Sequence, residues 1–343
     1  MAGFFTRLAA RCTEIGSLLC VGLDPHPADL RPAGAPSAQA ARDFCLRLIE
    51  ATADCAAAYK PNAAFFEAFG AAGWAALTEV IAAARTIAPV VLDAKRGDIA
   101  STAEAYARTL FETLGADAAT ISPYLGRDSL TPFLADAQRG VFLLCKTSNP
   151  GATDLQDLVL AGAPAQTLWE RIATLAQAWN EHDNLGLVVG ATYPAALRRA
   201  RAIAPDLWIL APGVGAQGGE LAEALAAGLR GDGLGLLIPV SRAISRAADP
   251  RQAAHALVAA MRAAARWPKP PLPTRKTPPA PAPPLSAQRG DSNSDLDQPS
   301  DLADALLEAG CVRFGQFTLK SGLRSPIYLD LRQLIAAPAL LRR

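Results

Sequence analysis

Three charged residues follow a short hydrophobic run in the first third of the chain. The run Val90–Leu92 leads into Asp93, Lys95 and Asp98. Such a β-branched run predicts a buried parallel strand, and residues two apart in a strand point the same way. We therefore expect Asp93 and Lys95 to share one face at the end of the strand, with Asp98 in the following loop. An isolated pair of this kind is also typical of a surface salt bridge, which contributes little.

Charged or polar residues recur at the ends of other predicted strands. They are Asp24, Lys60, the segment 146–151 with Ser148, the segment 212–219 with Pro212 and Gln217, and the pair Ser241-Arg242. Any one of them could be a structural ion pair or a turn. Six such sites, each at the C-terminal end of a strand, indicate the catalytic edge of a barrel enzyme.

Alternating strand and helix patterns extend to about residue 265. The predicted strands are 17–22, 56–60, 89–95, 118–121, 140–146, 185–190, 207–211 and 235–240. Each is followed by a segment of helical period, the one after Asp98 opening with Ser101 and Glu104, which fit a capping box. Eight such units in roughly 250 residues predict a (β/α)8 TIM barrel of the α/β class. A doubly wound sheet is the alternative, because composition does not reveal closure.

The segment 213–218 fits the pattern G-x-G-x-x-G. This pattern suggests dinucleotide binding, but it follows the seventh predicted strand, whereas a Rossmann fold carries it after the first. Glycine-rich loops also hold phosphate through backbone N–H groups, and barrels often hold phosphate after strands seven and eight. Arg242 offers a planar donor fork to such a phosphate. We interpret the region as a grip for a phosphomonoester.

Composition excludes several classes of function. The net charge of +1 gives no footprint for nucleic acid or an anionic membrane, and no hydrophobic run is long enough to span a bilayer. Six cysteines without a C-x-x-C pair predict free thiols and no disulfide framework. Three histidines without metal-ligand spacing predict no metal site. We expect a cytoplasmic protein.

The C-terminal third changes character abruptly. Residues 267–284 are rich in proline and residues 286–300 are polar, which predicts a linker, stiff first and flexible after. Residues 301–343 regain order, with a short helix before Gly310 and a strand over 326–331. About 43 residues are too few for an independent core. We expect residues 1–266 to form the barrel, 267–300 a linker, and 301–343 the start of a domain whose remainder is missing.

Several motifs together resemble one enzyme family. The resemblance is to orotidine 5′-phosphate decarboxylase, and it lies in the segments 92–99 (LDAKRGDI), 22–25 (GLDP), 60–67 (KPNAAFFE) and 212–218 (PGVGAQG). The sequences of 60–67 and 93–99 are similar to those of its longer bacterial subgroup. The segments 306–310, 314–322 and 325–330 are similar to the start of orotate phosphoribosyltransferase. That family's acidic loop for the diphosphate-ribose substrate is absent from this sequence, so we expect no phosphoribosyl transfer.

The resemblance implies decarboxylation of orotidine 5′-monophosphate to UMP in pyrimidine biosynthesis, without metal or organic cofactor. It implies a catalytic array of Lys60, Asp93, Lys95 and Asp98, with Lys95 as proton donor and Asp98 reaching into the neighbouring site of a homodimer. Asp24 and Lys60 would hold the ribose together with the partner's Thr102, and Ser148 would contact the pyrimidine. Pro212, Gln217, Ser241 and Arg242 would bind the phosphate.

Three other functions remain open. Relatives in the barrel superfamily act on sugar phosphates and share the Asp-x-Lys-x-x-Asp pattern, but they need Mg²⁺ held by acids, whereas the second predicted strand here ends in the cation Lys60. A nicotinamide oxidoreductase would depend on the segment 213–218 alone. An interaction module would use the linker and the tail to dock a separate phosphoribosyltransferase; we favour a tail that is the remnant of a broken fusion.

Overall fold

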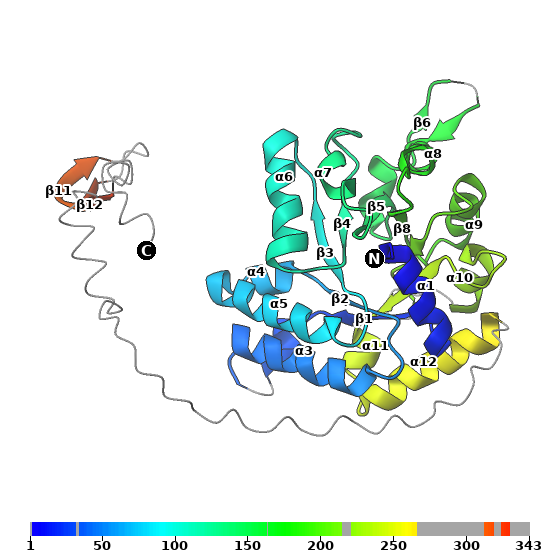
Figure 1. Ribbon diagram of the computed structural model, residues 1–343, viewed down its shortest axis with the longest axis horizontal. Coiled ribbons are helices and arrows are strands. Elements are labelled where there is room, and N and C mark those ends of the chain that lie inside the picture. Colours follow the sequence, from blue (N-terminus) through cyan, green and yellow to red (C-terminus); the bar gives the residue numbers. More distant parts are fainter. Residues whose placement is uncertain are drawn as a thin grey trace. The chain divides into compact units, whose positions relative to one another are not determined.

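A computed structural model describes residues 2–31, 34–162, 164–214, 221–265, 312–318 and 324–329. The chain divides into two units, residues 1–275 and 276–343. In the first unit, parallel strands form a central barrel and helices lie outside it (Figure 1).

Eight of the strands form the barrel. They are β1 (Leu19–Leu23), β2 (Ala58–Pro61), β3 (Val91–Arg96), β4 (Ala118–Ile121), β5 (Gly140–Lys146), β8 (Leu185–Val189), β9 (Ile209–Leu210) and β10 (Leu236–Val240). Their order is β2-β1-β10-β9-β8-β5-β4-β3, and all pairings are parallel. The sheet closes because parallel bridges join Tyr59 to Val90 and Asn62 to Asp93. The predicted TIM barrel is confirmed, and the doubly wound alternative is wrong.

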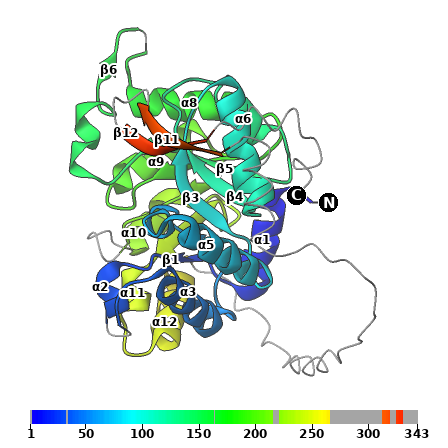
Figure 2. The ribbon, with the colours of Figure 1, turned by 90° about the vertical axis from the view of Figure 1, so that its left-hand side faces the viewer.

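Helices follow the strands on the outside of the barrel, as Figure 2 shows for α5 and α6 beside β3 and β4. They are α1 (Phe4–Ile15), α2 (Pro27–Leu30), α3 (Ala38–Thr52), α4 (Ala64–Glu67), α5 (Gly70–Arg85), α6 (Ala100–Arg108) with a π-helical turn (Thr109–Thr113), α7 (Thr131–Leu134), a 3₁₀ turn (Pro150–Asp154), α8 (Leu168–Trp179), α9 (Pro194–Ile203), α10 (Leu221–Gly228), α11 (Arg242–Ser245) and α12 (Pro250–Ala265). No helix in these described segments is both long and hydrophobic enough to cross a membrane.

Helix α6 begins differently from the sequence prediction. Its first residue is Ala100, and the residue before it, Ile99, supplies no side-chain cap. The Ile99 carbonyl accepts hydrogen bonds from the N–H groups of Thr102 and Ala103. Ser101 is therefore already inside the helix, and the predicted capping box is wrong.

Helix α1 covers the end of the barrel where the strands begin. The Phe5 ring stacks on Trp208 with centroids 6.0 Å apart and meets the Phe142 ring edge-on at 5.4 Å. Gly140, the first residue of β5, lies so close to Phe4 that an added Cβ would come within 2.3 Å of its ring. Since aromatic packing closes this end, the carboxyl ends of the strands are left to form the site.

A short hairpin interrupts the connection between β5 and α8. Strands β6 (Val159–Leu160) and β7 (Gln166–Thr167) pair antiparallel, and Thr167 and Glu170 then form a capping box that starts α8. Leu155, Leu158 and Val159 are exposed around this hairpin. The sequence did not predict this hairpin.

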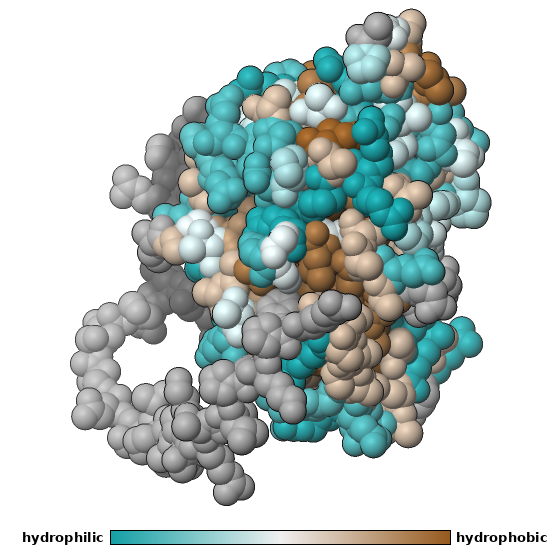
Figure 3. All heavy atoms as spheres, turned by 90° about the vertical axis from the view of Figure 1, so that its right-hand side faces the viewer, coloured by the Kyte–Doolittle hydropathy of each residue, from teal (hydrophilic) through white to brown (hydrophobic). Residues whose placement is uncertain are grey.

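Figure 3 shows that teal hydrophilic residues cover much of the barrel surface in its view, with smaller brown hydrophobic areas between them.

The second unit contains two described strands. Strand β11 (Val312–Thr318) pairs antiparallel with β12 (Arg324–Leu329). The strand predicted at 326–331 is therefore present but begins two residues earlier. The linker over 267–300 and the helix predicted before Gly310 lie outside the described residues.

The described cysteines are free and buried: Cys12, Cys20, Cys45, Cys55 and Cys145. Burial raises the pKa of the Cys20 and Cys145 thiols to about 12 and that of Cys55 to about 11. The thiolate is the reactive form of cysteine. These side chains therefore behave as small core residues.

We expect the folded protein to resist thiol reagents. At pH 8 a thiol with a pKa near 12 holds roughly 1,000-fold less thiolate than an ordinary cysteine. Titration with Ellman's reagent should be carried out on the Cys311→Ser variant, because Cys311 lies outside the described residues. In its folded state this variant should react slowly, and all five of its thiols should react only in denaturant. Rapid reaction of the native variant would contradict the buried assignment.

Candidate active site

Lys60, Asp93 and Lys95 meet at the carboxyl ends of β2 and β3. The Lys60 Nζ atom lies 2.9 Å from Asp93 Oδ2, and the Lys95 Nζ atom lies 2.5 Å from Asp93 Oδ1. The side chains of Lys60 and Asp93 are 9% and 12% exposed, while that of Lys95 is 50% exposed. One carboxylate thus bridges a buried ammonium group and an accessible one. The predicted proximity of Asp93 and Lys95 is confirmed.

The charges in this cluster stabilise one another. Burial alone would raise the pKa of the Asp93 carboxyl, but the ammonium groups of Lys60 and Lys95 hold that pKa well below its usual range. Burial would likewise lower the pKa of Lys60, but the carboxylates of Asp93 and Asp24 raise it above its usual value. Lys60 is therefore cationic and Asp93 anionic at neutral pH, where the arrangement offers fixed charges to a bound molecule.

Asp24 and Ser241 lie together where β1 and β10 end. A Cβ added to Gly22 would lie 2.7 Å from Ser241 Cβ and 3.2 Å from Asp24 Oδ2, so this glycine lets the two side chains approach. The Asp24 Oδ1 and Ser241 Oγ atoms are buried and have no hydrogen-bond partner among the described residues. Buried polar atoms normally have partners. Both atoms are therefore available to bind hydroxyl or phosphate groups of a ligand.

Asp98 and Thr102 make no ion pair or hydrogen bond with the lysine cluster among the described residues. The Asp98 carboxylate accepts a hydrogen bond from the Ile99 N–H group at 2.8 Å. Within the described part of this chain it makes no ion pair with Lys60 or Lys95. Thr102 is exposed on the first turn of α6. The structure of one chain therefore brings together three of the four predicted catalytic residues.

The described residues predicted to contact the phosphate and the ring follow β5, β9 and β10 at the same barrel edge. Arg242 is exposed at the first position of α11, and Pro212 follows β9. Ser148 follows β5 and lies close to Gly190, since a Cβ added there would be 3.0 Å from the Ser148 Cβ atom. Gln217 lies outside the described residues.

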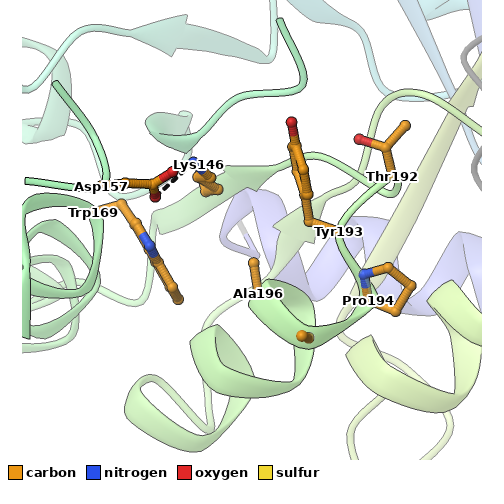
Figure 4. A pocket seen from close by; sticks show the side chains of 8 residues that line it. Lys146, Asp157, Trp169, Thr192, Tyr193, Pro194 and Ala196 are labelled. Atoms are coloured by element: carbon orange, nitrogen blue, oxygen red, sulfur yellow. Dashed lines mark hydrogen bonds and ion pairs between the residues drawn. The ribbon is translucent and has the colours of Figure 1, made fainter. Parts of the chain in front are cut away.

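A cavity of about 490 Å³ lies beside Lys146 and between α8 and α9 (Figure 4). The Lys146 Nζ atom is 2.7 Å from both oxygens of Asp157 and 5.3 Å from the centroid of the Tyr193 ring. None of the predicted catalytic residues lines this cavity. Because Asp157 already holds its ammonium group, we assign Lys146 a structural role.

One group of side chains could offer ligands to a metal. Potential ligand atoms of Asp54, Cys55 and His255 lie within 4.8 Å of one another, although the sequence gave no spacing that indicated them. The Asp54 carboxylate is ion-paired with Arg251 and lies 3.2 Å from His255 Nε2. These partners satisfy Asp54 without a metal. Cys55 lies three residues before β2, at the opposite end of that strand from Lys60.

Sequence reasoning missed Thr120 on β4. The Thr120 hydroxyl donates a hydrogen bond of 2.9 Å to Asp93 Oδ1. The signal was present, since Thr120 is the one hydroxyl-bearing residue in the strand segment Ala118–Ile121, which is otherwise hydrophobic and buried throughout. A lone polar residue in a buried strand must find a partner, and here the partner is the central carboxylate of the site.

Comparisons with known proteins agree on one family. Residues 17–257 match the family described as Orotidine 5′-phosphate decarboxylase / HUMPS family. The orotidine 5′-phosphate decarboxylase of Roseiflexus castenholzii is 52% identical over 272 residues, which cover 77% of this chain and 98% of that protein. The structure of Leishmania donovani OMP decarboxylase matches with a TM-score of 0.70 and 54% identity, covering 77% of this chain and 99% of the other. The structure of Leishmania donovani UMP synthase matches with a TM-score of 0.72 and 51% identity, covering 100% of this chain and 68% of the other.

Proposed function

The chain belongs to the Orotidine 5′-phosphate decarboxylase / HUMPS family, and from that premise we propose that its barrel converts orotidine 5′-monophosphate to UMP and CO2 in pyrimidine biosynthesis. The observation that supports this most is the cluster of Lys60, Asp93 and Lys95 at the carboxyl ends of β2 and β3. Its fixed charges suit a reaction in which a carboxylate leaves and a proton takes its place.

The chemistry assigns one task to each charge. The Asp93 carboxylate lies against the substrate carboxylate, and like charges held close raise the free energy of the bound substrate. The bond between the pyrimidine carbon and the carboxylate breaks and CO2 leaves. The electron pair of that bond remains on the pyrimidine carbon. The Lys95 ammonium group stabilises that negative charge and donates a proton to the carbon. Lys60 keeps Asp93 ionised and properly placed, because its ammonium group binds the other carboxylate oxygen.

The remaining contacts bind the substrate away from the reacting carbon. Asp24 and Lys60 hold the ribose hydroxyls, for which the unpartnered Asp24 Oδ1 atom is an available acceptor. Ser148 contacts the pyrimidine. Pro212, Gln217, Ser241 and Arg242 bind the phosphate, where a remote group supplies binding energy that assists the chemistry.

Product analysis in heavy water tests this proposal. The full-length protein should release CO2 and UMP in equal amounts from orotidine 5′-monophosphate. Mass spectrometry should find one deuterium in the pyrimidine ring, because the exchangeable ammonium group supplies the new ring proton. UMP without deuterium would contradict the protonation step, and absence of UMP would contradict the proposed reaction.

Replacing Arg242 with alanine should mainly weaken substrate binding. The variant loses a charge-assisted contact with the phosphate, so its KM for orotidine 5′-monophosphate should rise roughly 10- to 100-fold. The matched control is Arg246→Ala, four residues along, because the Arg246 guanidinium is paired with Asp29. Steady-state kinetics on both variants provide the measurement. An unchanged KM in Arg242→Ala would argue against the phosphate grip.

We also propose a homodimer with shared sites, in which Asp98 and Thr102 act on the partner's substrate. This accounts for the lack of an ion pair between Asp98 and the lysines in the described part of its own chain. The adjoining loops after β3 and β4 expose Ile99, Tyr124 and Leu125, and Tyr124 is 84% exposed. Exposed hydrophobic side chains on these two loops suit a surface that a second subunit covers.

Three finer assignments complete the proposal. The C-terminal residues 301–343 are the start of an orotate phosphoribosyltransferase domain joined by the linker 267–300, which agrees with the match of the UMP synthase structure over the whole chain. The barrel belongs to the longer bacterial subgroup, which residues 60–67 and 93–99 resemble. Free buried thiols in the described segments are consistent with the reducing cytoplasm.

A further inference from the structure

Strand β3 is irregular at the point where it carries the catalytic residues. It pairs regularly with β4 through Val91 and Leu92, which lie opposite Ala118 and Ala119, but the next pair is Arg96 and Ile121. Three residues of β3 (Asp93, Ala94 and Lys95) therefore lie opposite Thr120 alone. Such a bulge removes the regular ladder partners of the extra residues and re-aims their side chains.

The backbone at the bulge adopts an unusual conformation. Lys95 has a φ of 48°, in the left-handed region that residues with a side chain rarely occupy. With this backbone conformation the Lys95 Nζ atom lies 2.5 Å from Asp93 Oδ1. Because the conformation is unfavourable by itself, something in the surrounding structure must hold it.

Thr120 supplies the hydrogen-bond partners that β3 loses at the bulge. Its Oγ1 atom accepts hydrogen bonds from the Ala94 N–H group at 3.1 Å and from the Lys95 N–H group at 3.0 Å. It donates its single proton to Asp93 Oδ1 at 2.9 Å. A hydroxyl group has one donor and two acceptor positions, so all are used. Since Thr120 is 2% exposed, water does not compete for them.

We propose that Thr120 is the positioning residue of the active site: its one hydroxyl group holds the β3 bulge and orients both the Asp93 carboxylate and the Lys95 ammonium group for catalysis. Thr120 does not touch the substrate in this assignment and acts through these two residues. The inference deepens the proposed decarboxylase function and, for its kinetic part, rests on it.

The variant Thr120→Val tests the assignment, because it keeps the shape of the side chain and removes the hydroxyl group. Misplacement of catalytic groups by about 1 Å costs on the order of 100-fold in rate, so kcat should fall by about that factor. The KM for orotidine 5′-monophosphate should change by less than about threefold, because the ribose and phosphate contacts remain. Thr120→Ser keeps the hydroxyl group and should restore kcat to within about fivefold of the wild type.

If Thr120→Val does not fold, Thr120→Ala replaces it, because it also removes the hydroxyl group. A kcat near the wild-type value in the variant that folds would overturn the proposal. So would a Thr120→Ser variant as slow as Thr120→Val, because a merely structural defect in packing would not be corrected by the hydroxyl group.

A second readout separates this inference from the proposed reaction. Amide hydrogen exchange over residues 93–97 should be faster in Thr120→Val than in the wild type, while exchange elsewhere in β4 and β5 stays the same. This measurement needs no substrate. Wild-type protein without decarboxylase activity would refute the proposed function alone, and unchanged exchange at the bulge would refute the role of Thr120.

Discussion

Replacing Lys95 with alanine is expected to abolish decarboxylation while the barrel stays folded. Lys95 is the assigned proton donor and the cation nearest to the developing negative charge, so kcat should fall on the order of 10⁴-fold or more. The fold should persist because the Lys95 side chain is half exposed. Loss of its ion pair with Asp93 also leaves the Lys60–Asp93 pair in place. Steady-state kinetics, circular dichroism and thermal unfolding of the same preparation provide the measurement.

The matched control is another lysine at a strand end. Lys146 ends β5, but its ammonium group is held by Asp157, whose side chain is 40% exposed and stays hydrated without it. Lys146→Met should therefore keep kcat within about tenfold of the wild type. Near-normal turnover in a folded Lys95→Ala variant would remove Lys95 from the mechanism. Equal losses in both variants would mean that any strand-end lysine matters and that the assignment lacks specificity.

Two inactive variants are expected to restore activity when they are mixed. In the proposed homodimer each site takes Lys95 from one subunit and Asp98 from the other. A mixed dimer of Lys95→Ala and Asp98→Ala then contains one fully damaged site and one intact site. When subunits exchange freely at equal concentrations, half of the dimers are mixed, so about one quarter of the wild-type activity should return.

The measurement is turnover of the mixture against each variant alone after unfolding and joint refolding. A mixture of Lys95→Ala with Lys60→Ala serves as the control, because both residues belong to the same chain's cluster. That mixture should restore nothing above the sum of its parts, since every site in its mixed dimer lacks one lysine. No recovery in the first mixture would contradict the shared site and would leave Asp98 without its assigned role.

Most of the barrel could be predicted from the sequence because its strands are short hydrophobic runs bounded by polar turns. The predicted segments 118–121 and 140–146 coincide with β4 and β5, and the others differ by a few residues at their ends. Closure depended on contacts between β2 and β3 that no local pattern records. The β6–β7 hairpin was missed for a related reason, since its two-residue strands are too short to give a period.

The site was predictable in composition but not in its local geometry. Strand alternation predicted that Asp93 and Lys95 would share one face, and their side chains do make contact, but through a bulge and a left-handed backbone at Lys95. The bulge depends on a hydroxyl group contributed by the next strand, Thr120, which lies 25 residues after Lys95 in the chain. The helix start at Ala100 was misjudged because Ser101 and Glu104 suit a cap by residue type alone.

We propose that the Lys60–Asp93–Lys95 cluster decarboxylates orotidine 5′-monophosphate without a metal. The most direct test is the change in ultraviolet absorbance of this substrate with the purified full-length protein in excess EDTA. We predict rapid, complete conversion that added Mg²⁺ does not accelerate. No conversion by the folded protein, or conversion that appears only when Mg²⁺ is restored, would contradict this proposal and would point instead to the metal-dependent sugar-phosphate enzymes of this barrel superfamily.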